Sequence, residues 1–298
     1  MKVADAHCDT LTKFKDNPFH SEDAHWSLEK FNEAGGVLQY FAVFTPPQYS
    51  GDSAVRFAFN AIGNFYSKNR GKVNLLLSPD GFKDDKVNIL LSLEGATPII
   101  DDLNNLRVFY ELGVRAMGLT WNHRNYVADG IDNPYGLTAF GVELIKEMEN
   151  MNMIIDVSHL NVAGFDDVVK NTSKPFIASH SNAHKIFAHP RNLYDEQIKE
   201  IITRGGFIGM NFYPDIICDD KDNLKAGLLQ HIEYMLELGA ADVLGMGADF
   251  DGIPSAPFDD VRGYIELEQM LRNDLKLDYT LIEKIMYKNL MDYTLKYI

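Results

Sequence analysis

The chain has little cysteine, no long apolar run and no excess of basic residues, and each absence excludes a class of protein. Its 298 residues contain two cysteines, Cys8 and Cys218, too few for a disulfide framework, which favours a reducing compartment. No apolar run approaches the roughly 20 residues that a membrane span needs. The N-terminus also lacks the apolar core of a signal peptide. We therefore expect a cytoplasmic protein without a membrane partner.

The charge balance and the missing nucleotide motifs exclude further classes. A net charge of −15 would repel the phosphates of nucleic acid. The sequence contains neither a phosphate-binding GxxxxGK[ST] motif nor a dinucleotide-binding GxGxxG motif, so no nucleotide cofactor is indicated. There is no low-complexity segment, linker or short repeat. The composition is that of an ordinary globular protein, and we expect a single domain over residues 1–298.

What is present is an alternation of short apolar runs with amphipathic stretches. The apolar runs predict eight strands, at residues 2–6, 36–44, 87–93, 116–119, 153–156, 175–178, 207–211 and 243–246. The amphipathic stretches predict helices at residues 53–68, 103–112, 136–151, 161–171, 195–204, 222–238, 261–271, 280–288 and 291–297. Eight strands alternating with helices predict a (β/α)8 TIM barrel, although an open doubly wound sheet has the same pattern. The short run at 75–77 is not placed by this pattern.

Polar residues follow almost every predicted strand. They are His7, Asp9, Glu94, His159, His180, Asn211, Tyr213 and Asp249. In a barrel the strands end on one face, where active sites are built, so these side chains are expected to meet there. Scattered surface residues would not produce this placement.

Five of these residues have the chemistry of metal ligands: His7, Asp9, Glu94, His159 and His180. Because a single catalytic zinc takes three or four ligands, five suit two metals that share a carboxylate, with Glu94 as the natural bridge. Such a pair would hold a hydroxide between the ions, and the inferred reaction class is metal-assisted hydrolysis. The alternatives are an ion pair of Glu94 with Arg or Lys and hydrogen-bonded core positions for His159 and His180.

Asp249 lies in the glycine-containing stretch Gly245-Met246-Gly247-Ala248-Asp249. A carboxylate at this position would take a proton from the attacking water and return it to a leaving amine. It would equally well bind an ammonium group. The alternative is a turn without chemistry, which describes Asp251 better than Asp249.

Taken together, these motifs resemble the membrane dipeptidase (renal dipeptidase, peptidase M19) family of the amidohydrolase superfamily. The matching stretches are Asp5-Ala6-His7-Cys8-Asp9, Leu93-Glu94-Gly95, Leu119-Thr120-Trp121-Asn122, Asp156-Val157-Ser158-His159, Ser179-His180-Ser181-Asn182, Pro190-Arg191-Asn192, Asn211-Phe212-Tyr213 and Gly247-Ala248-Asp249-Phe250-Asp251-Gly252. The resemblance implies a (β/α)8 barrel of the metal-dependent hydrolase type that carries two zinc ions and cleaves free dipeptides.

The resemblance also implies a role for each matching residue. His7 and Asp9 would hold one zinc, His159 and His180 the other, and Glu94 would bridge them. Arg191 is expected to bind the substrate carboxylate, which suits a planar guanidinium. Asp249 corresponds to the family's acid near the scissile amide, and Tyr213 to an aromatic residue of the substrate pocket.

One position departs from the family pattern. Some members carry a histidine after Leu-Thr that reaches the substrate carbonyl, whereas this chain has Trp121. An indole offers one N–H donor and cannot replace an imidazole as electrophile. We expect Trp121 to line the substrate pocket and take His123 as a candidate catalytic stand-in, the alternative being a surface histidine.

Three functions follow from these residues. The first is a zinc-dependent dipeptidase. The second is another amidohydrolase that acts on a cyclic amide, an ester or an N-acyl amino acid, and the third is a metal-binding protein without turnover. The same ligands suit manganese, cobalt or iron. The dipeptide preference is not readable from the sequence, and a homodimer is the default expectation. Five other histidines are expected on the surface: His20, His25, His184, His189 and His231.

Overall fold

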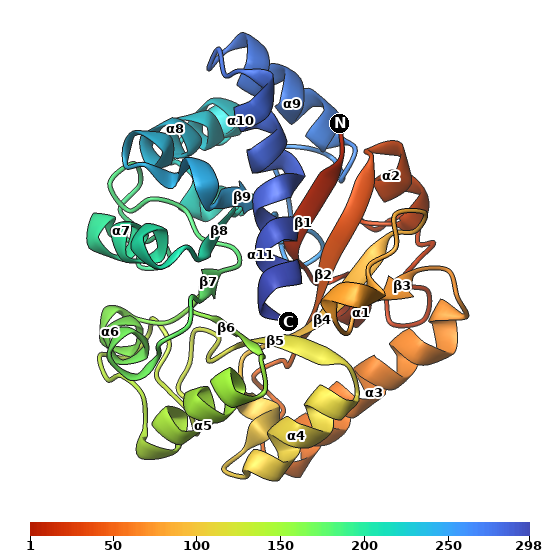
Figure 1. Cartoon of the computed structure of the whole chain (residues 1–298), viewed down its shortest axis with the longest axis vertical. Coiled ribbons are helices and arrows are strands. Elements are labelled where there is room, and N and C mark those ends of the chain that lie inside the picture. Colours follow the sequence, from red (N-terminus) through yellow and green to blue (C-terminus); the bar gives the residue numbers. More distant parts are fainter.

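A computed structural model describes residues 1–298, and parallel strands form a closed barrel at its centre (Figure 1). The eight barrel strands are β1 (Val3–Cys8), β2 (Gly36–Phe44), β4 (Asn88–Glu94), β5 (Val114–Gly118), β6 (Ile154–Asp156), β7 (Ile177–Ala178), β8 (Phe207–Met210) and β9 (Leu244–Met246). Their order is β2-β1-β9-β8-β7-β6-β5-β4, and a parallel pairing of β2 with β4 closes the ring. The predicted (β/α)8 barrel is confirmed. The unplaced apolar run begins in the short strand β3 (Asn74–Leu75), which pairs with β4 outside the ring.

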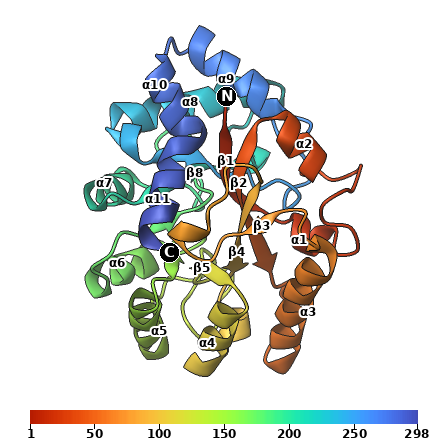
Figure 2. The ribbon, with the colours of Figure 1, turned by 45° about the vertical axis from the view of Figure 1, so that its right-hand side comes forward.

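Most helices lie around the outside of the barrel, whereas the last one crosses one of its ends (Figures 1 and 2). The helices are α1 (Thr10–Lys13), α2 (Leu28–Glu33), α3 (Asp52–Asn69), α4 (Leu103–Glu111), α5 (Ala139–Asn150), α6 (Val162–Asn171), α7 (Asp195–Arg204), α8 (Leu224–Glu237), α9 (Gly263–Asn273), α10 (Tyr279–Glu283) and α11 (Asn289–Tyr297). Short 3-10 turns lie at Pro79–Gly81, Thr97–Ile99, Pro214–Ile216, Lys221–Asn223 and Ala240–Asp242. No helix combines the length and apolar character needed to span a bilayer.

The sequence prediction differs from the structure in the shortest and the last helices. Helices α1 and α2 have four and six residues and lack the length for a clear periodic pattern. The two C-terminal helices predicted as separate are joined by a π-helical turn, Lys284–Lys288, so the chain runs from α10 into α11 without a loop. A π-turn shifts the helical phase, which hides the continuity from a periodicity argument.

Local sequence explains where several helices begin. The side chains of Ser27, Asp102, Thr138, Asn161 and Asp278 each accept a hydrogen bond from a backbone N–H in the first turn of the helix that follows. Such caps satisfy donors that would otherwise lack partners within the helix. These helices therefore start at fixed points and leave the preceding strand-to-helix loops free to carry function.

A small apolar cluster fills the barrel interior, and one helix covers the barrel at the amino ends of the strands. The strands contribute Ala4, Ala6, Leu38, Tyr40, Leu90, Ala116, Ile154, Ile177 and Phe207. Leu290 and Tyr293 of α11 belong to the same cluster, and the Tyr40 hydroxyl lies 2.7 Å from Thr294 Oγ1. Figure 1 shows α11 lying across this end of the barrel. A larger core of 63 buried residues lies between the strands and the outer helices.

Candidate metal centre

The five predicted metal ligands lie together at the carboxyl ends of the barrel strands. His7 is in β1 and Glu94 ends β4, whereas Asp9, His159 and His180 come from the loops after β1, β6 and β7. All five are at least nine-tenths buried. Two groups drawn from this cluster and its neighbour Asp249 have ligand atoms within 4.8 Å of one another: His7, Glu94 and His180, and His7, Asp9 and Asp249.

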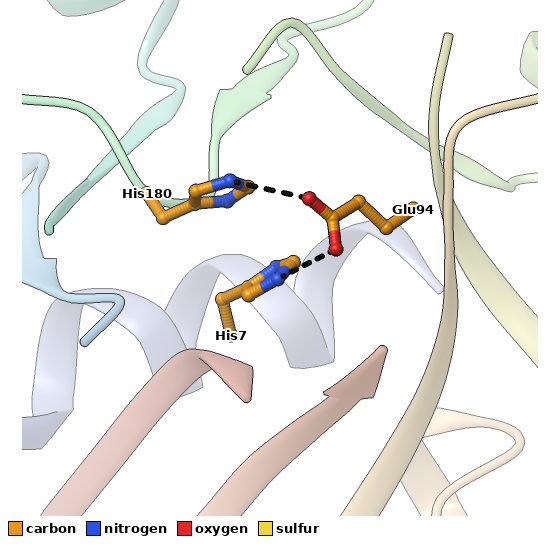
Figure 3. Close-up of side chains that lie close together, drawn as sticks. All are labelled: His7, Glu94 and His180. Atoms are coloured by element: carbon orange, nitrogen blue, oxygen red, sulfur yellow. Dashed lines mark ion pairs between the residues drawn. The ribbon is translucent and has the colours of Figure 1, made fainter. Parts of the chain in front are cut away.

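Glu94 lies between the two sides of the cluster, with one oxygen facing each side. Its Oε2 lies 3.3 Å from Nε2 of His7. Its Oε1 lies 3.1 Å from Nε2 of His159 and 3.8 Å from Nε2 of His180. Figure 3 shows the carboxylate pointing toward His7 and His180 from across the barrel. This is the orientation of a carboxylate that bridges two cations.

The other side of the cluster contains His7, Asp9 and Asp249. Nε2 of His7 lies 3.4 Å from Asp9 Oδ2 and 3.9 Å from Asp249 Oδ1. His7 Nε2 and Asp9 Oδ1 are buried and have no hydrogen-bond partner in the chain. Buried polar atoms are normally paired. These two unpaired ligand atoms therefore fit a cation between them.

A register shift in β1 turns His7 into the site. Asp5 faces outward and hydrogen-bonds to the Tyr264 hydroxyl of α9. Strict alternation would point His7 the same way. The pairing of β1 with β2 shifts register between Asp5 and Cys8, and Asp5 Oδ1 accepts a hydrogen bond of 2.8 Å from the His7 N–H. Cys8 packs in the outer core instead.

Hydrogen bonds to the outer ring nitrogens orient His159 and His180. Nδ1 of His159 lies 2.7 Å from Asn122 Oδ1, an acceptor, so Nδ1 carries the proton. Nδ1 of His180 lies 2.7 Å from Ser179 Oγ, which donates its own proton to Asp156 Oδ2 at 2.5 Å. Both Nε2 atoms therefore present a lone pair, and they lie 2.9 Å apart.

Burial sets the charge states of these residues. It lowers the pKa of His159 to about 3 and that of His180 well below its usual range, so both rings are neutral. Neutral imidazole is the form that binds a metal. Burial would also lower the pKa of His7, but the neighbouring Glu94 and Asp9 carboxylates raise it well above its usual range. Burial and the Glu94 charge raise the pKa of Asp249 to about 6, although His7 and Arg191 oppose the shift.

Two site residues adopt a backbone conformation that is rare for residues other than glycine. His159 has a φ of 70° and Asp249 a φ of 64°. Such left-handed residues cluster at functional sites, where surrounding contacts hold them. Next to Asp249, a Cβ on Gly247 would lie 1.7 Å from the Ser179 carbonyl oxygen. Glycine is therefore required where β9 passes the loop that carries His180.

Arg191 is buried beside the cluster without an ion pair. Its Nη2 donates to the His180 carbonyl at 3.2 Å, the one hydrogen bond that its guanidinium makes within the chain. Burial lowers its pKa to about 10, so it stays charged. Asp249 accepts a hydrogen bond of 3.2 Å from Asn211. The Tyr213 hydroxyl donates to Asp215 at 2.7 Å and faces the outside of the site.

Trp121 lines two cavities at the mouth of the barrel. The first, of about 310 Å³, contains Asp9, Glu94, His159 and Asp249 and is the metal pocket. The second, of about 680 Å³, lies beside it and is lined by His123. Nδ1 of His123 lies 2.6 Å from Asp132 Oδ2, and its ring is 5.2 Å from the Trp121 ring. His123 therefore lies outside the metal pocket, 58% exposed.

Sequence reasoning missed several residues that position the site. Asn122 and Ser179 orient the two imidazoles; Ser179 directly precedes His180 in the sequence, whereas Asn122 comes from a different loop than His159. Asp156 acts on His180 through Ser179, whose hydroxyl donates to Asp156 Oδ2. Lys13, in the short helix α1, lines the metal pocket.

The expected surface position of His231 is wrong. The residue is fully buried in α8. Its Nδ1 accepts from the Ala183 N–H at 3.1 Å, and its Nε2 donates to the Ile217 carbonyl at 2.9 Å. It thereby holds the loop that follows His180. Periodicity alone does not reveal that two loop backbones reach this helix face. The other four histidines are partly exposed.

Comparisons with known proteins bear on this geometry. The family model described as membrane dipeptidase (peptidase family M19) matches residues 1–294. A protein encoded in the pqqA 5′ region of Klebsiella pneumoniae, itself uncharacterised, is 33% identical over 236 residues, covering 74% of this chain and 87% of that protein.

Two crystal structures are similar over the whole chain. One is a dipeptidase of family M19 with a TM-score of 0.92 and 28% identity, covering 100% of this chain and 98% of that one. The other is a metallopeptidase from Rhodobacter sphaeroides that holds a phosphinate mimic of the dipeptide L-Ala-D-Ala. It has a TM-score of 0.92 and 26% identity and covers 100% and 99% of the two chains.

Proposed function

Because the chain belongs to the membrane dipeptidase family (peptidase family M19) and is a metal-dependent hydrolase, we propose that it hydrolyses free dipeptides. The proposed cofactor is a pair of divalent metal ions, with zinc as the first candidate. The observation that carries this proposal is the Glu94 carboxylate, whose two oxygens face His7 on one side and His159 and His180 on the other. The alternative expected from the sequence, an ion pair of Glu94 with Arg or Lys, is not formed: its ion-pair partners are the three histidines.

His7 and Asp9 would hold one ion, His159 and His180 the other, and Glu94 both. The unpaired atoms His7 Nε2 and Asp9 Oδ1 support this assignment. Facing lone pairs on two imidazoles support it as well. When bound, the ions would supply Lewis-acid activation of a water molecule and of the scissile carbonyl. The remaining steps depend on residues of the chain.

Arg191 would bind the free carboxylate of the dipeptide. A guanidinium has five N–H donors, and that of Arg191 uses one of them within the chain. Its burial strengthens a bidentate pair with a carboxylate, because little water competes there. This requirement for a carboxylate separates a dipeptidase from an amidohydrolase that acts on esters or cyclic amides.

Asp249 would carry the proton. Its carboxylate borders the metal pocket, and the Asn211 amide holds one of its oxygens. A pKa raised to about 6 by burial allows it to accept a proton from the attacking water and release it to the leaving amine near neutral pH. Trp121 would line the substrate pocket, and Tyr213 would lie further out on the loop after β8. His123 could reach the substrate only from the neighbouring cavity.

The test compares a dipeptide with its C-terminal amide on zinc-loaded protein. The free dipeptide is expected to have at least a hundredfold higher kcat/KM, because the amide leaves the buried Arg191 charge unpaired. Arg191→Ala should remove most of this difference by lowering kcat/KM for the free dipeptide. Lys199→Ala, on the exposed side of α7, is the matched control and should keep it. Equal rates for the two substrates would reject the dipeptidase assignment.

A further inference from the structure

A cavity of about 680 Å³ adjoins the metal pocket, and none of the five candidate metal ligands lines it. It lies between the loop after β2 and the long loop that joins β5 to α5, and Trp121 is the residue it shares with the metal pocket. The metal pocket alone, at about 310 Å³, is at the small end of the range for ligand sites. A dipeptide with a large side chain would need more room.

Residues 44–47 form the boundary between the two cavities. Phe44 and Pro46 line the metal pocket, whereas Thr45 and Pro47 line the larger cavity. The alternation follows from extended backbone, in which successive side chains point to opposite sides. The Phe44 and Trp121 rings lie 5.2 Å apart at this boundary. A side chain that leaves the metal pocket past this aromatic pair would enter the larger cavity directly.

The lining of the larger cavity suits an uncharged aromatic group. Arg124 and His123 are its two basic residues, and both are already paired, Arg124 with Asp129 at 3.1 Å and His123 with Asp132 at 2.6 Å. Aromatic rings come from Tyr49, Trp121 and Tyr126. The Thr45 hydroxyl, in a side chain that is 6% exposed, has no hydrogen-bond partner.

The position of the cavity decides which substrate residue it would take. In the closed ring of strands, β2 lies four places from β7 in either direction, so the loops after these strands face each other across the barrel. Arg191 follows β7, whereas the cavity lies between the loop after β2 and the loop after β5, a strand two places from β7. A dipeptide whose carboxylate is on Arg191 therefore directs its amino-terminal residue toward the cavity.

We propose that this cavity is the binding site for the amino-terminal side chain of the substrate and that it selects dipeptides with a large aromatic residue at that position. The proposal rests on the dipeptidase function. Binding past Trp121 would place the aromatic side chain against Tyr49 and Tyr126, and the amide or hydroxyl groups of the lining would accept a tyrosine hydroxyl.

The experiment measures turnover and binding on the metal-loaded full chain. Turnover is compared for Ala-Ala, Phe-Ala, Tyr-Ala and Ala-Phe. Binding is measured by calorimetry with two phosphinate dipeptide mimics that differ in a methyl or benzyl group on the amino-terminal side. We expect Phe-Ala and Tyr-Ala to exceed Ala-Ala about tenfold in kcat/KM, and the benzyl mimic to bind about tenfold more tightly.

Two variants connect this preference to the cavity. Thr97→Trp fills the cavity and should abolish the preference, while kcat/KM for Ala-Ala changes less than about twofold; Thr97→Ser is the control. Tyr126→Ala, at a residue 51% exposed, should reduce the preference about fivefold. Equal Kd values for the two mimics, or a preference seen only for Ala-Phe, would overturn the proposal. Benzyl selectivity without any dipeptide cleavage would leave the binding site intact and refute the dipeptidase function instead.

Discussion

Nε2 of His159 and Nε2 of His180 lie 2.9 Å apart, and each presents a lone pair to the other. Asn122 and Ser179 hold the protons on the opposite nitrogens, so neither ring can donate to its neighbour. The contact is repulsive in the bare chain and becomes favourable once a cation accepts both lone pairs. The bare chain thus has a local destabilisation that a metal ion bound by both rings would relieve.

Removal of metal should therefore lower stability as well as activity. A chelator is expected to lower the Tm on the order of 10 °C, since saturation at 1,000 times Kd contributes about 4 kcal/mol. Restoring zinc should restore both the Tm and hydrolysis, as followed by calorimetry and a dipeptide assay. In the Glu94→Gln variant, chelation should lower the Tm by a much smaller amount. An unchanged Tm after complete chelation would contradict the assignment.

Ser179→Ala should weaken metal binding. The change removes the hydroxyl that accepts from His180 Nδ1 and donates to Asp156, so the ring loses its fixed tautomer. A loss of about 10- to 100-fold in metal affinity is expected, with kcat largely restored at saturating metal. Competition with a chromogenic chelator measures the affinity.

Ser181→Ala is the matched control for this change. Ser181 is equally buried and two residues away, but its hydroxyl approaches Ser158 at 3.5 Å and does not bond to the ring. Its metal affinity should stay within about twofold of the unmodified protein. If both serine variants bound metal equally well, the Ser179 contact would have no orienting role.

Asp249→Asn should separate catalysis from metal binding. The amide keeps the shape of the carboxylate but cannot carry a proton, so kcat is expected to fall about 100- to 10,000-fold while both metals remain. Metal analysis and steady-state kinetics on one preparation check this. Near-normal turnover would rule out Asp249 as the proton carrier.

Asp251→Asn provides the contrast. Asp251 accepts hydrogen bonds from Thr10 Oγ1 and the His25 N–H, each at 2.6 Å, and connects the loop after β9 to the segment after β1. Its replacement should lower the unfolding free energy by about 1–3 kcal/mol and leave kcat of the folded fraction within a few-fold.

His231 should make stability depend on pH. Burial lowers its pKa to about 4, against about 6.5 when the chain is unfolded. Between these values the unfolded chain binds the extra proton, so its stability contribution is complete above pH 6.5 and falls with falling pH. From pH 6.5 to 5 the loss is about 2 kcal/mol. Urea unfolding at several pH values measures this dependence. In His231→Gln the unfolding free energy should fall less steeply between pH 6.5 and 5, and an equal pH dependence in both proteins would contradict the buried neutral state.

The sequence was sufficient for the barrel and for the meeting of most strand-end polar residues, Tyr213 excepted, because strand periodicity and strand-end chemistry are local patterns. The inward turn of His7 accompanies a register shift in the pairing of β1 with β2, and the lone pair of His159 depends on Asn122 from another loop. Neither can be read from spacing. The buried position of His231 likewise depends on two backbones that approach α8 from elsewhere in the chain.

Helix α11 limits how substrates enter and products leave the barrel. Leu290 and Tyr293 seal the lower end of the barrel, so the metal pocket communicates with solvent through its upper mouth. Both amino acids released by cleavage must leave by the route along which the next dipeptide arrives. If Arg191 binds carboxylates as proposed, a freed amino acid bound there would delay that arrival, and the products should act as competitive inhibitors.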